Sequence, residues 1–235
     1  ATGIGSIDST GSVNTDAGFS IMSYTGTGSV ETFAHGLNSA PELVILRNRE
    51  VASNWWVWGE LLGNNQIMEL DTTSAKYNPN GNYHNDTMPT SSVISIGSDG
   101  QVSGNGQSHI CYAFHSVQGY SKIGSYTGNG NADGTFVYTG FKPAFVMIKK
   151  TDSAGNFWHI YDNKRSTSGS NVVDDVLYPN RSDAEYSEAR LDFVSNGFKI
   201  RTTNGDINTS GGNYIFMCFA ENPFTTSTGV PATAR

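Results

Sequence analysis

The amino-acid sequence predicts an all-β protein, an antiparallel β-sandwich of the jelly-roll or lectin-like type built from two tandem pseudo-repeats. Short apolar and aromatic runs alternate with turns rich in Gly, Ser, Thr and Asn; 27 of the 235 residues are glycine and only 15% are charged. This composition is typical of strands joined by tight turns. Because no long helical period interrupts the pattern, we expect about 14 short strands.

An internal duplication is the second observation behind this prediction. Segments of the first half recur in the second half, most of them at one offset of 102 residues, which a chance likeness of short segments does not produce. Two copies of one β unit therefore form the scaffold of the chain. The matching segments are 24–26 with 126–128, 41 with 143, 43–46 with 145–148 and 54–56 with 156–158, followed by 94–100 with 191–197 and 110–114 with 215–219.

The domain boundaries follow from this duplication. Residues 18–118 form the first β repeat and residues 119–224 the second. Residues 1–17 are rich in Gly, Ser and Thr and are interpreted as a linker or N-terminal arm, and residues 225–235 as a C-terminal tail. Since the sequence begins with Ala rather than Met, we expect a processed product or the last part of a longer polypeptide.

The elements of each repeat follow in order. A strand at 19–24 enters the Tyr-Thr-Gly turn, and a strand at 42–47 follows a proline and is apolar on both faces, which predicts a central position in its sheet. The closing strands carry Cys111 and Cys218, which we expect to be buried thiols, although a disulfide between them stays open. Hairpin turns are expected at 98–100 and 195–197.

The aromatic strand of the first repeat separates two faces. Alternation places Trp56 and Trp58 on one face, expected to be the core, and Trp55 with Val57 on the other. Because aromatic residues dominate protein cores, burial is the alternative for every one of them. Trp55 is the strongest candidate to contact a partner.

The offset of 102 residues transfers this arrangement to the second repeat. Trp158 and Ile160 then face the core, and Phe157 and His159 lie on the opposite face. We therefore expect Phe157 and His159 to be accessible to a ligand.

The two repeats diverge in an insert, residues 61–90 in the first and 166–190 in the second. Variable loops on a repeated scaffold are the usual place for binding specificity, and their Tyr, Asn and Asp side chains suit sugars. Lys164 and Arg165 follow the aromatic strand and either clasp an anionic ligand or form intramolecular ion pairs. The candidate ligand-binding residues are Trp55, Tyr77, Tyr83, Phe157, His159, Tyr178, Tyr186, Lys164 and Arg165.

Charge excludes several partners. The formal net charge is −7 and the 14 Lys and Arg residues are scattered, so neither nucleic acid nor an anionic lipid surface is an expected partner. No apolar window approaches the length of about 18 residues that a spanning helix needs, so we expect no membrane insertion.

The sequence contains no recognisable catalytic or metal motif. It lacks G-x-S-x-G and H-E-x-x-H, and its five histidines are spread apart, so neither a catalytic residue nor a zinc site is assigned. An acidic run at 174–188 has no counterpart in the first repeat and resembles a solvated loop more than a pair of glycosidase carboxylates. No cofactor is expected, with calcium the one candidate ion, at Asp71, Asp86, Asp99, Asp133 or the second insert.

Several segments resemble a known family. The segments YTGNG, TGFKPA, DNKR, NGFK and FAENPF are similar to a C-terminal domain of tail-fibre-like structural proteins of bacteriophages, many of them from marine or fresh water, and the likeness extends from Gly18 onward. In such proteins a similar domain often follows a concanavalin-like lectin domain. The resemblance implies a location on the virion surface and assigns no catalytic residues. The segments lie at 126–130, 139–144, 162–165, 196–199 and 219–224.

Together these observations predict a virion surface protein, as a tail fibre, spike or capsid decoration domain. It would bind a host cell-surface carbohydrate and contact other virion proteins, and a homotrimer is expected because fibres usually assemble so. One alternative is a purely structural virion module, and a second is a depolymerase that cuts polysaccharide.

Overall fold

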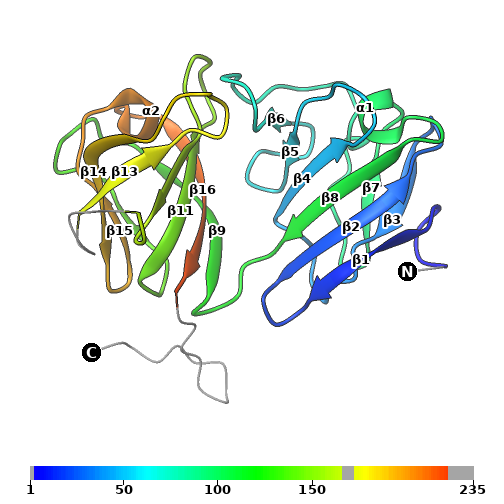
Figure 1. Cartoon of the computed structure of the whole chain (residues 1–235), viewed down its shortest axis with the longest axis horizontal. Helices are drawn as coiled ribbons and strands as arrows, with labels where there is room; N and C mark the ends of the chain where they lie inside the picture. Colours follow the sequence, from blue (N-terminus) through cyan, green and yellow to red (C-terminus); the bar gives the residue numbers. More distant parts are fainter. Residues whose placement is uncertain (1–2, 166–171, 222–235) are drawn as a thin grey trace. The chain divides into compact units, whose positions relative to one another are not determined.

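A computed structural model describes residues 3–165 and 172–221. Strands make up 43% of the chain and helices 4%, which confirms the predicted all-β class. Contacts divide the chain into two compact units (Figure 1): unit 1 is Ala1–Asp71 with Lys76–His115, and unit 2 is Thr72–Ala75 with Ser116–Arg235. Each unit contains one copy of the duplicated β structure.

Unit 1 is a sandwich of two antiparallel sheets. The six-stranded sheet has the order β1-β2-β8-β4-β5-β6, the small sheet pairs β3 with β7, and in Figure 1 the small sheet lies behind the large one. Phe33 and Ile94 from the small sheet meet Leu46, Trp56 and Trp58 from the large sheet in the core. The elements are β1 (Ser9–Asn14), β2 (Phe19–Thr25), β3 (Glu31–Ala34), β4 (Leu43–Asn48), β5 (Trp56–Trp58), β6 (Met68–Glu69), β7 (Val93–Ile96), α1 (Gly100–Ser103) and β8 (Ser108–Phe114).

Unit 2 folds one continuous sheet of eight strands into a barrel-like sandwich. Its strand order is β9-β16-β11-β12-β13-β14-β15-β10. The two end strands approach each other, since Lys122 Nζ lies 5.6 Å from the Tyr138 ring centroid and Thr135 Oγ1 donates to Thr127 O at 2.7 Å. The elements are β9 (Ser121–Thr127), β10 (Phe136–Tyr138), β11 (Pro143–Lys150), β12 (His159–Asp162), β13 (Val173–Leu177), β14 (Tyr186–Val194), β15 (Gly197–Ile200), α2 (Gly205–Asn208) and β16 (Asn213–Ala220).

The core of unit 2 lies between the two halves of this folded sheet. Phe193 and Phe198 from one half meet Val146, Ile148 and Phe216 from the other half, and all five are buried. Full burial of an aliphatic or Phe side chain contributes about 1.5–3 kcal/mol, so this contact stabilises the folded-over arrangement. The apolar strands β4 and β11 lie inside their sheets, as predicted from their two apolar faces.

A matched hydrogen bond marks the duplication in both units. Tyr24 Oη of β2 donates to the Val102 carbonyl of α1 at 2.5 Å, and Tyr126 Oη of β9 donates to the Ile207 carbonyl of α2 at 2.8 Å. Both acceptors lie in a single helical turn, where backbone carbonyls lack helical partners. In each unit, a tyrosine at the matching position therefore bonds the short helix to the sheet.

The turn predicted at 98–100 is wrong, and the alignment of 94–100 with 191–197 is wrong with it. Asp99 is the N-cap of α1, and its carboxylate accepts from Gln101 N at 2.8 Å. The structural counterpart is Asn204, the N-cap of α2, because Asx-Gly sequences serve helix caps as well as turns. Likewise β7 corresponds to β15, since β7 pairs with β3 as β15 pairs with β10. The second hairpin is confirmed, with Val194 paired to Gly197.

The N-terminal segment contains more structure than a linker or arm. Residues 9–14 form β1, which pairs with β2 over six residues, and the buried Ser9 hydroxyl donates to the Ala34 carbonyl at 2.6 Å. The rest of β1 is exposed, so its sequence shows no apolar alternation from which a strand could be predicted. The ladder of backbone hydrogen bonds holds this edge strand in place.

The aromatic strand of unit 1 has the predicted faces. Trp56 and Trp58 are buried in the core cluster, while Trp55 is half-buried outside it. The expected burial of the cysteines is also confirmed, because Cys111 and Cys218 are both buried and unpaired.

The faces predicted for the second aromatic strand are wrong, because the register of the strand is shifted by one residue. His159 and Tyr161 pair with the core positions of β11, and they lie 103 residues after the paired tryptophans of β5 rather than 102. The loop before β12 is thus one residue longer, and such a shift moves every side chain to the other face of the sheet. His159 is fully buried against the Tyr161 hydroxyl group, and Ile160 is half-exposed. Trp158 is buried but lies outside the core cluster.

Candidate ligand pocket of unit 2

An open pocket lies at one end of unit 2. Its volume is about 360 Å³, within the range of small-ligand sites. Its walls come from the loop before β12, the segment after β13, the strand β14 and the helix α2. The lining residues are Phe157, Tyr178, Arg181, Asp183, Ala184, Tyr186, Arg190 and Asp206.

A turn presents Arg181 at the pocket wall. Arg181 N donates to Tyr178 O at 3.1 Å, which closes a four-residue turn with proline in its second position. The Arg181 guanidinium carbon lies 4.3 Å from the Phe157 ring centroid and 5.5 Å from that of Tyr178. Arg181 also forms an ion pair with Asp183. Ring stacking and the ion pair therefore hold this cation in a defined position.

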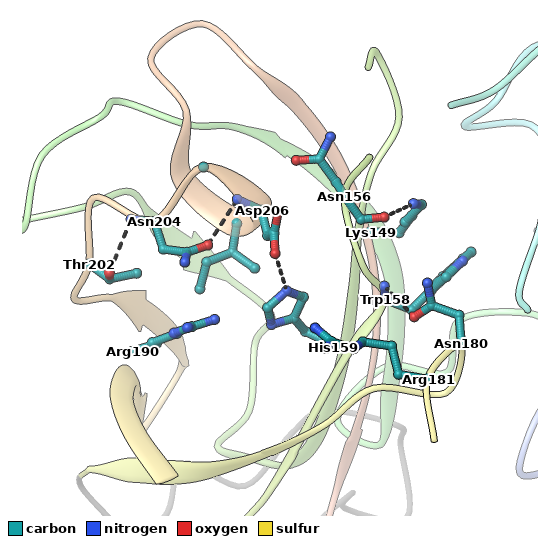
Figure 2. Close-up of polar contacts among 12 residues, drawn as sticks. Lys149, Asn156, Trp158, His159, Asn180, Arg181, Arg190, Thr202, Asn204 and Asp206 are labelled. Carbon is teal, nitrogen blue, oxygen red and sulfur yellow. Dashed lines mark hydrogen bonds and ion pairs between the residues drawn. The ribbon is translucent and has the colours of Figure 1, made fainter. Parts of the chain in front are cut away.

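Asn180 anchors the same turn to unit 2. Its Oδ1 accepts from Trp158 N at 3.1 Å, and its Nδ2 donates to Thr72 O at 3.0 Å. Figure 2 shows the first of these bonds beside the Arg181 side chain. Because both ends of the amide are bonded, the turn carrying Arg181 is fixed in the folded unit.

Arg190 of β14 is the most buried charge in the pocket wall. Its side chain is only 7% exposed, and Nη2 donates to Glu188. Among the residues that the structure describes, the Nε and Nη1 atoms have no acceptor in good hydrogen-bond geometry, although the Tyr161 and Tyr178 hydroxyl groups lie near the guanidinium. The guanidinium carbon lies 5.9 Å from the ring centroid of Tyr186, and Figure 2 shows the guanidinium group directed toward His159.

Asp206 and His159 form the floor beside Arg190. Asn204 Oδ1 accepts from Asp206 N at 2.9 Å, and Asp206 Oδ2 lies 3.3 Å from His159 Nε2 (Figure 2). His159 Nδ1 lies 3.2 Å from the Tyr161 hydroxyl oxygen. Burial lowers the pKa of His159, so the ring is neutral at pH 7. Because a carboxylate only accepts, we assign the ring proton to Nε2, and Nδ1 accepts from Tyr161.

The pocket therefore offers three kinds of contact. Phe157, Tyr178 and Tyr186 supply aromatic rings, and Tyr186 is 51% exposed. Arg190 supplies N–H donors, and carboxylate oxygens supply acceptors. This combination suits a ligand with an apolar face and several polar groups.

The corresponding region of unit 1 contains a packed tyrosine. Gln101 follows the cap of α1 as Asp206 follows the cap of α2, and Trp56 occupies the strand position of His159. The Tyr83 ring lies 4.1 Å from Trp56 between ring centroids, and Gln101 Nε2 donates to Tyr83 Oη at 3.4 Å. Burial raises the pKa of Tyr83 to about 12. Tyr83 thus packs where unit 2 has its pocket wall.

The other two aromatic candidates of unit 1 are also in contact with protein groups. Tyr77 packs against the core and its hydroxyl donates to Glu69 Oε1 at 2.9 Å. Trp55 is half-buried, with the Arg47 guanidinium carbon 5.1 Å from its ring centroid and the Tyr112 ring 6.1 Å away.

Lys164 and Arg165 are engaged in intramolecular ion pairs, the alternative that the sequence left open. Lys164 pairs with Glu221, and Arg165 Nε lies 2.6 Å from Asp162 Oδ2. Arg165 Nη1 also lies 2.5 Å from Glu185 Oε2. Neither residue lines the pocket.

Three of the four aspartates named for calcium contact other protein groups. Asp71 accepts from Trp55 N at 3.1 Å, Asp99 caps α1, and Asp133 Oδ1 lies 2.9 Å from Lys199 Nζ. Across residues 3–165 and 172–221, no group of three or more His, Cys, Asp or Glu side chains is placed to hold a metal ion. None of the helices in the same ranges is long and apolar enough to cross a membrane.

The pocket contains polar residues that the sequence reasoning did not select. Arg181, Arg190 and Asp206 come from three elements that meet only in the folded unit. The signal in the sequence was weak, because an isolated arginine in a polar loop or an exposed strand is normally solvated. Phe157, Tyr178 and Tyr186, selected from the sequence, do line the pocket, and His159 lies beneath it.

Fold and pocket together define an all-β protein of two related units with a candidate ligand pocket in the second. A family model described as a domain of unknown function, DUF7483, matches residues 1–223, so the chain belongs to that family. No curated protein and no solved structure matches the chain.

Proposed function

We propose that this chain is a surface domain of a bacteriophage virion, in a tail fibre, spike or capsid decoration, and that it attaches to a host cell-surface carbohydrate. The virion assignment rests on the resemblance of its sequence segments to tail-fibre-like proteins. The observation that carries the carbohydrate proposal is the unit 2 pocket, where the half-exposed ring of Tyr186 lies beside buried and exposed polar groups.

Carbohydrate chemistry fits this combination of groups. The C–H face of a pyranose ring packs on aromatic rings, and its hydroxyl groups bond to guanidinium donors and carboxylate acceptors. A single shallow site of this kind binds weakly. Assembly into a homotrimer would place three sites on one particle and raise the overall affinity through avidity.

A glycan array probed with the intact chain tests this proposal. We expect binding to a subset of bacterial surface glycans, reduced at least tenfold by Tyr186→Ala. Tyr138→Ala is the matched control, because Tyr138 is 60% exposed on β10 and lies outside the pocket lining. An array without signal from folded protein, or equal losses in both variants, would contradict the proposal.

A purely structural role in the virion is the second candidate. Phe136 and Tyr138 are exposed on the end strand β10, at 46% and 60%, and could contact another virion protein. In that case the Tyr138→Ala chain would fail to incorporate into particles, while Tyr186→Ala would incorporate normally.

A depolymerase is the third candidate, because Asp183 and Asp206 both line the pocket and glycosidases use paired carboxylates. Release of reducing ends from a bound polysaccharide, abolished by Asp206→Asn, would establish it. Binding without release favours the attachment role.

A further inference from the structure

We propose that the saccharide recognised by the pocket carries a carboxylate, and that Arg190 receives this group. The inference rests on the proposed carbohydrate function and names the chemical class of the ligand. Uronic acids and other carboxylated sugars are members of this class.

The incomplete bonding of Arg190 is the first argument. A guanidinium group has five N–H hydrogens and no means of losing its charge in a protein. Apart from the nearby Tyr161 and Tyr178 hydroxyl groups, the Nε and Nη1 atoms of Arg190, which together hold three of the five, have no acceptor among the described residues, although the side chain is only 7% exposed. Leaving buried charged donors unsatisfied is costly, so an acceptor that these N–H groups reach through a small rotation of the guanidinium gains affinity at this position.

The neighbours of Arg190 favour an anionic acceptor over a neutral one. Its described ion-pair partner is Glu188, whose side chain is 39% exposed and therefore screened by water. The Tyr161 and Tyr178 hydroxyl groups also lie close enough to interact with the guanidinium. Burial raises the pKa of both tyrosines, so they remain neutral and supply no negative charge. A ligand carboxylate would form the stronger, charge-assisted bond.

The remaining charged residues of the lining indicate whether an anionic ligand is selected by the overall charge of the pocket or by directed hydrogen bonds. Arg181 and Asp183 form an ion pair at the mouth, with side chains 39% and 47% exposed. With Arg190 and Asp206 the lining has two positive and two negative groups, so it produces no strong positive field. Selectivity for a carboxylate would therefore come from the directed N–H groups of Arg190, and we expect only a moderate dependence of affinity on salt.

The aromatic wall orients the sugar relative to Arg190. Tyr186 lies beside Arg190, with 5.9 Å between the guanidinium carbon and the ring centroid. A pyranose packed on the exposed part of this ring would place an exocyclic carboxylate next to the free donors. The hydroxyl groups of the same sugar would reach Asp183 and Asp206, which also line the pocket.

Binding of matched oligosaccharides to the intact chain tests the inference. The probes are tetrasaccharides of guluronate, mannuronate and galacturonate, the same compounds after reduction of their carboxyl groups to alcohols, neutral glycans from the array, and dextran sulfate. We expect at least one uronate to bind about 10- to 100-fold more tightly than its reduced form, as charge-assisted hydrogen bonds provide. Because the ligand is altered and the protein is not, this comparison is independent of folding.

Protein variants then assign the effect to Arg190. Arg190→Gln should abolish the preference for the uronate over its reduced form, and Arg190→Lys should retain only part of it, since Lys lacks the planar donors. Glu188→Gln removes the competing carboxylate and should strengthen uronate binding while leaving the reduced form unchanged. Urea unfolding of each variant confirms that it is folded.

The outcomes separate this inference from the proposed function. Equal binding of uronate and reduced forms, or binding of neutral glycans alone, would overturn the carboxylate inference and leave carbohydrate attachment standing. Dextran sulfate binding as tightly as the uronates would show recognition of charge alone and overturn the inference likewise. Absence of binding to every acidic and neutral glycan would overturn both.

Discussion

Replacing the two matched tyrosines by phenylalanine tests the duplicated fold most sharply. Tyr24→Phe and Tyr126→Phe each delete one hydroxyl group and keep the ring. Tyr24 is 3% exposed and Tyr126 is 8% exposed, and their acceptors Val102 and Ile207 are fully buried. Each substitution therefore removes a hydrogen bond and leaves a buried backbone carbonyl without it.

The expected magnitude follows from this geometry. A buried acceptor left unsatisfied costs about 1–3 kcal/mol, and the retained ring preserves the packing energy. The Tyr24 ring still stacks on Phe33 at 4.4 Å, and the Tyr126 ring on Tyr214 at 4.9 Å, between centroids. We expect each variant to lose about 1–3 kcal/mol, roughly 4 °C in melting temperature per kcal/mol for a unit of this size.

Urea and thermal unfolding of the intact chain measure the effect. Fluorescence and circular dichroism should both report a lowered midpoint for each variant. Tyr138→Phe, at a position 60% exposed, is the control and should change stability by less than about 0.5 kcal/mol. If both core variants matched the control, the hydroxyl groups would not bond the short helices, and the proposed equivalence of the two units would lose its main support.

The remaining predictions concern pH and backbone contacts. Burial lowers the pKa of His35, His84 and His109 in unit 1. As the pH falls below 6.5, these histidines therefore take up protons in the unfolded chain before they do so in the folded one. The free energy of unfolding should then decrease by up to about 1.4 kcal/mol per pH unit for each histidine. Urea midpoints that stay constant from pH 7 to 5 would contradict this. Gly197→Ala should cost at least about 2 kcal/mol in urea unfolding, because a Cβ there would lie 2.0 Å from a carbonyl oxygen of β10. Gly100→Ala, with no atom within 4 Å of its Cβ, should be neutral or slightly stabilising; equal losses in both would refute the assigned contact.

Much of the scaffold was predictable because repetition and alternation are local signals. The apolar strands at β4 and β11 and the buried pair Trp56 and Trp58 follow from these patterns. The strand β1 could not be predicted from these patterns, because backbone pairing holds it in place and all but one of its residues are exposed. The cap at Asp99 was missed because the same Asx-Gly sequence fits a turn and a helix start equally well.

The register error in β12 has a similar cause. Sequence alignment placed Trp158 on Trp56, whereas strand pairing places His159 there. One extra residue in a loop leaves the likeness of the two sequences almost unchanged but moves the strand to its other face. Only the pairing of β12 with β11 could resolve the two alternatives.

The pocket was predictable only in part. The inserts differ in sequence between the repeats, and Tyr178 and Tyr186 of the second insert line the pocket. Arg190 could not be selected, because its burial depends on the packing of β14 into the sheet. In unit 1, Tyr83 packs inward on Trp56. The composition of an insert does not tell whether its tyrosines pack inward or face a ligand.

Duplication gave two alike scaffolds, and the second carries the ligand pocket lined by Tyr186 and Arg190. Isothermal titration of the intact chain with a glycan found on the array measures the number of ligands bound per chain. We expect one ligand per chain, with binding weakened by Tyr186→Ala. Two equivalent ligands per chain, or one ligand unaffected by that substitution, would contradict it.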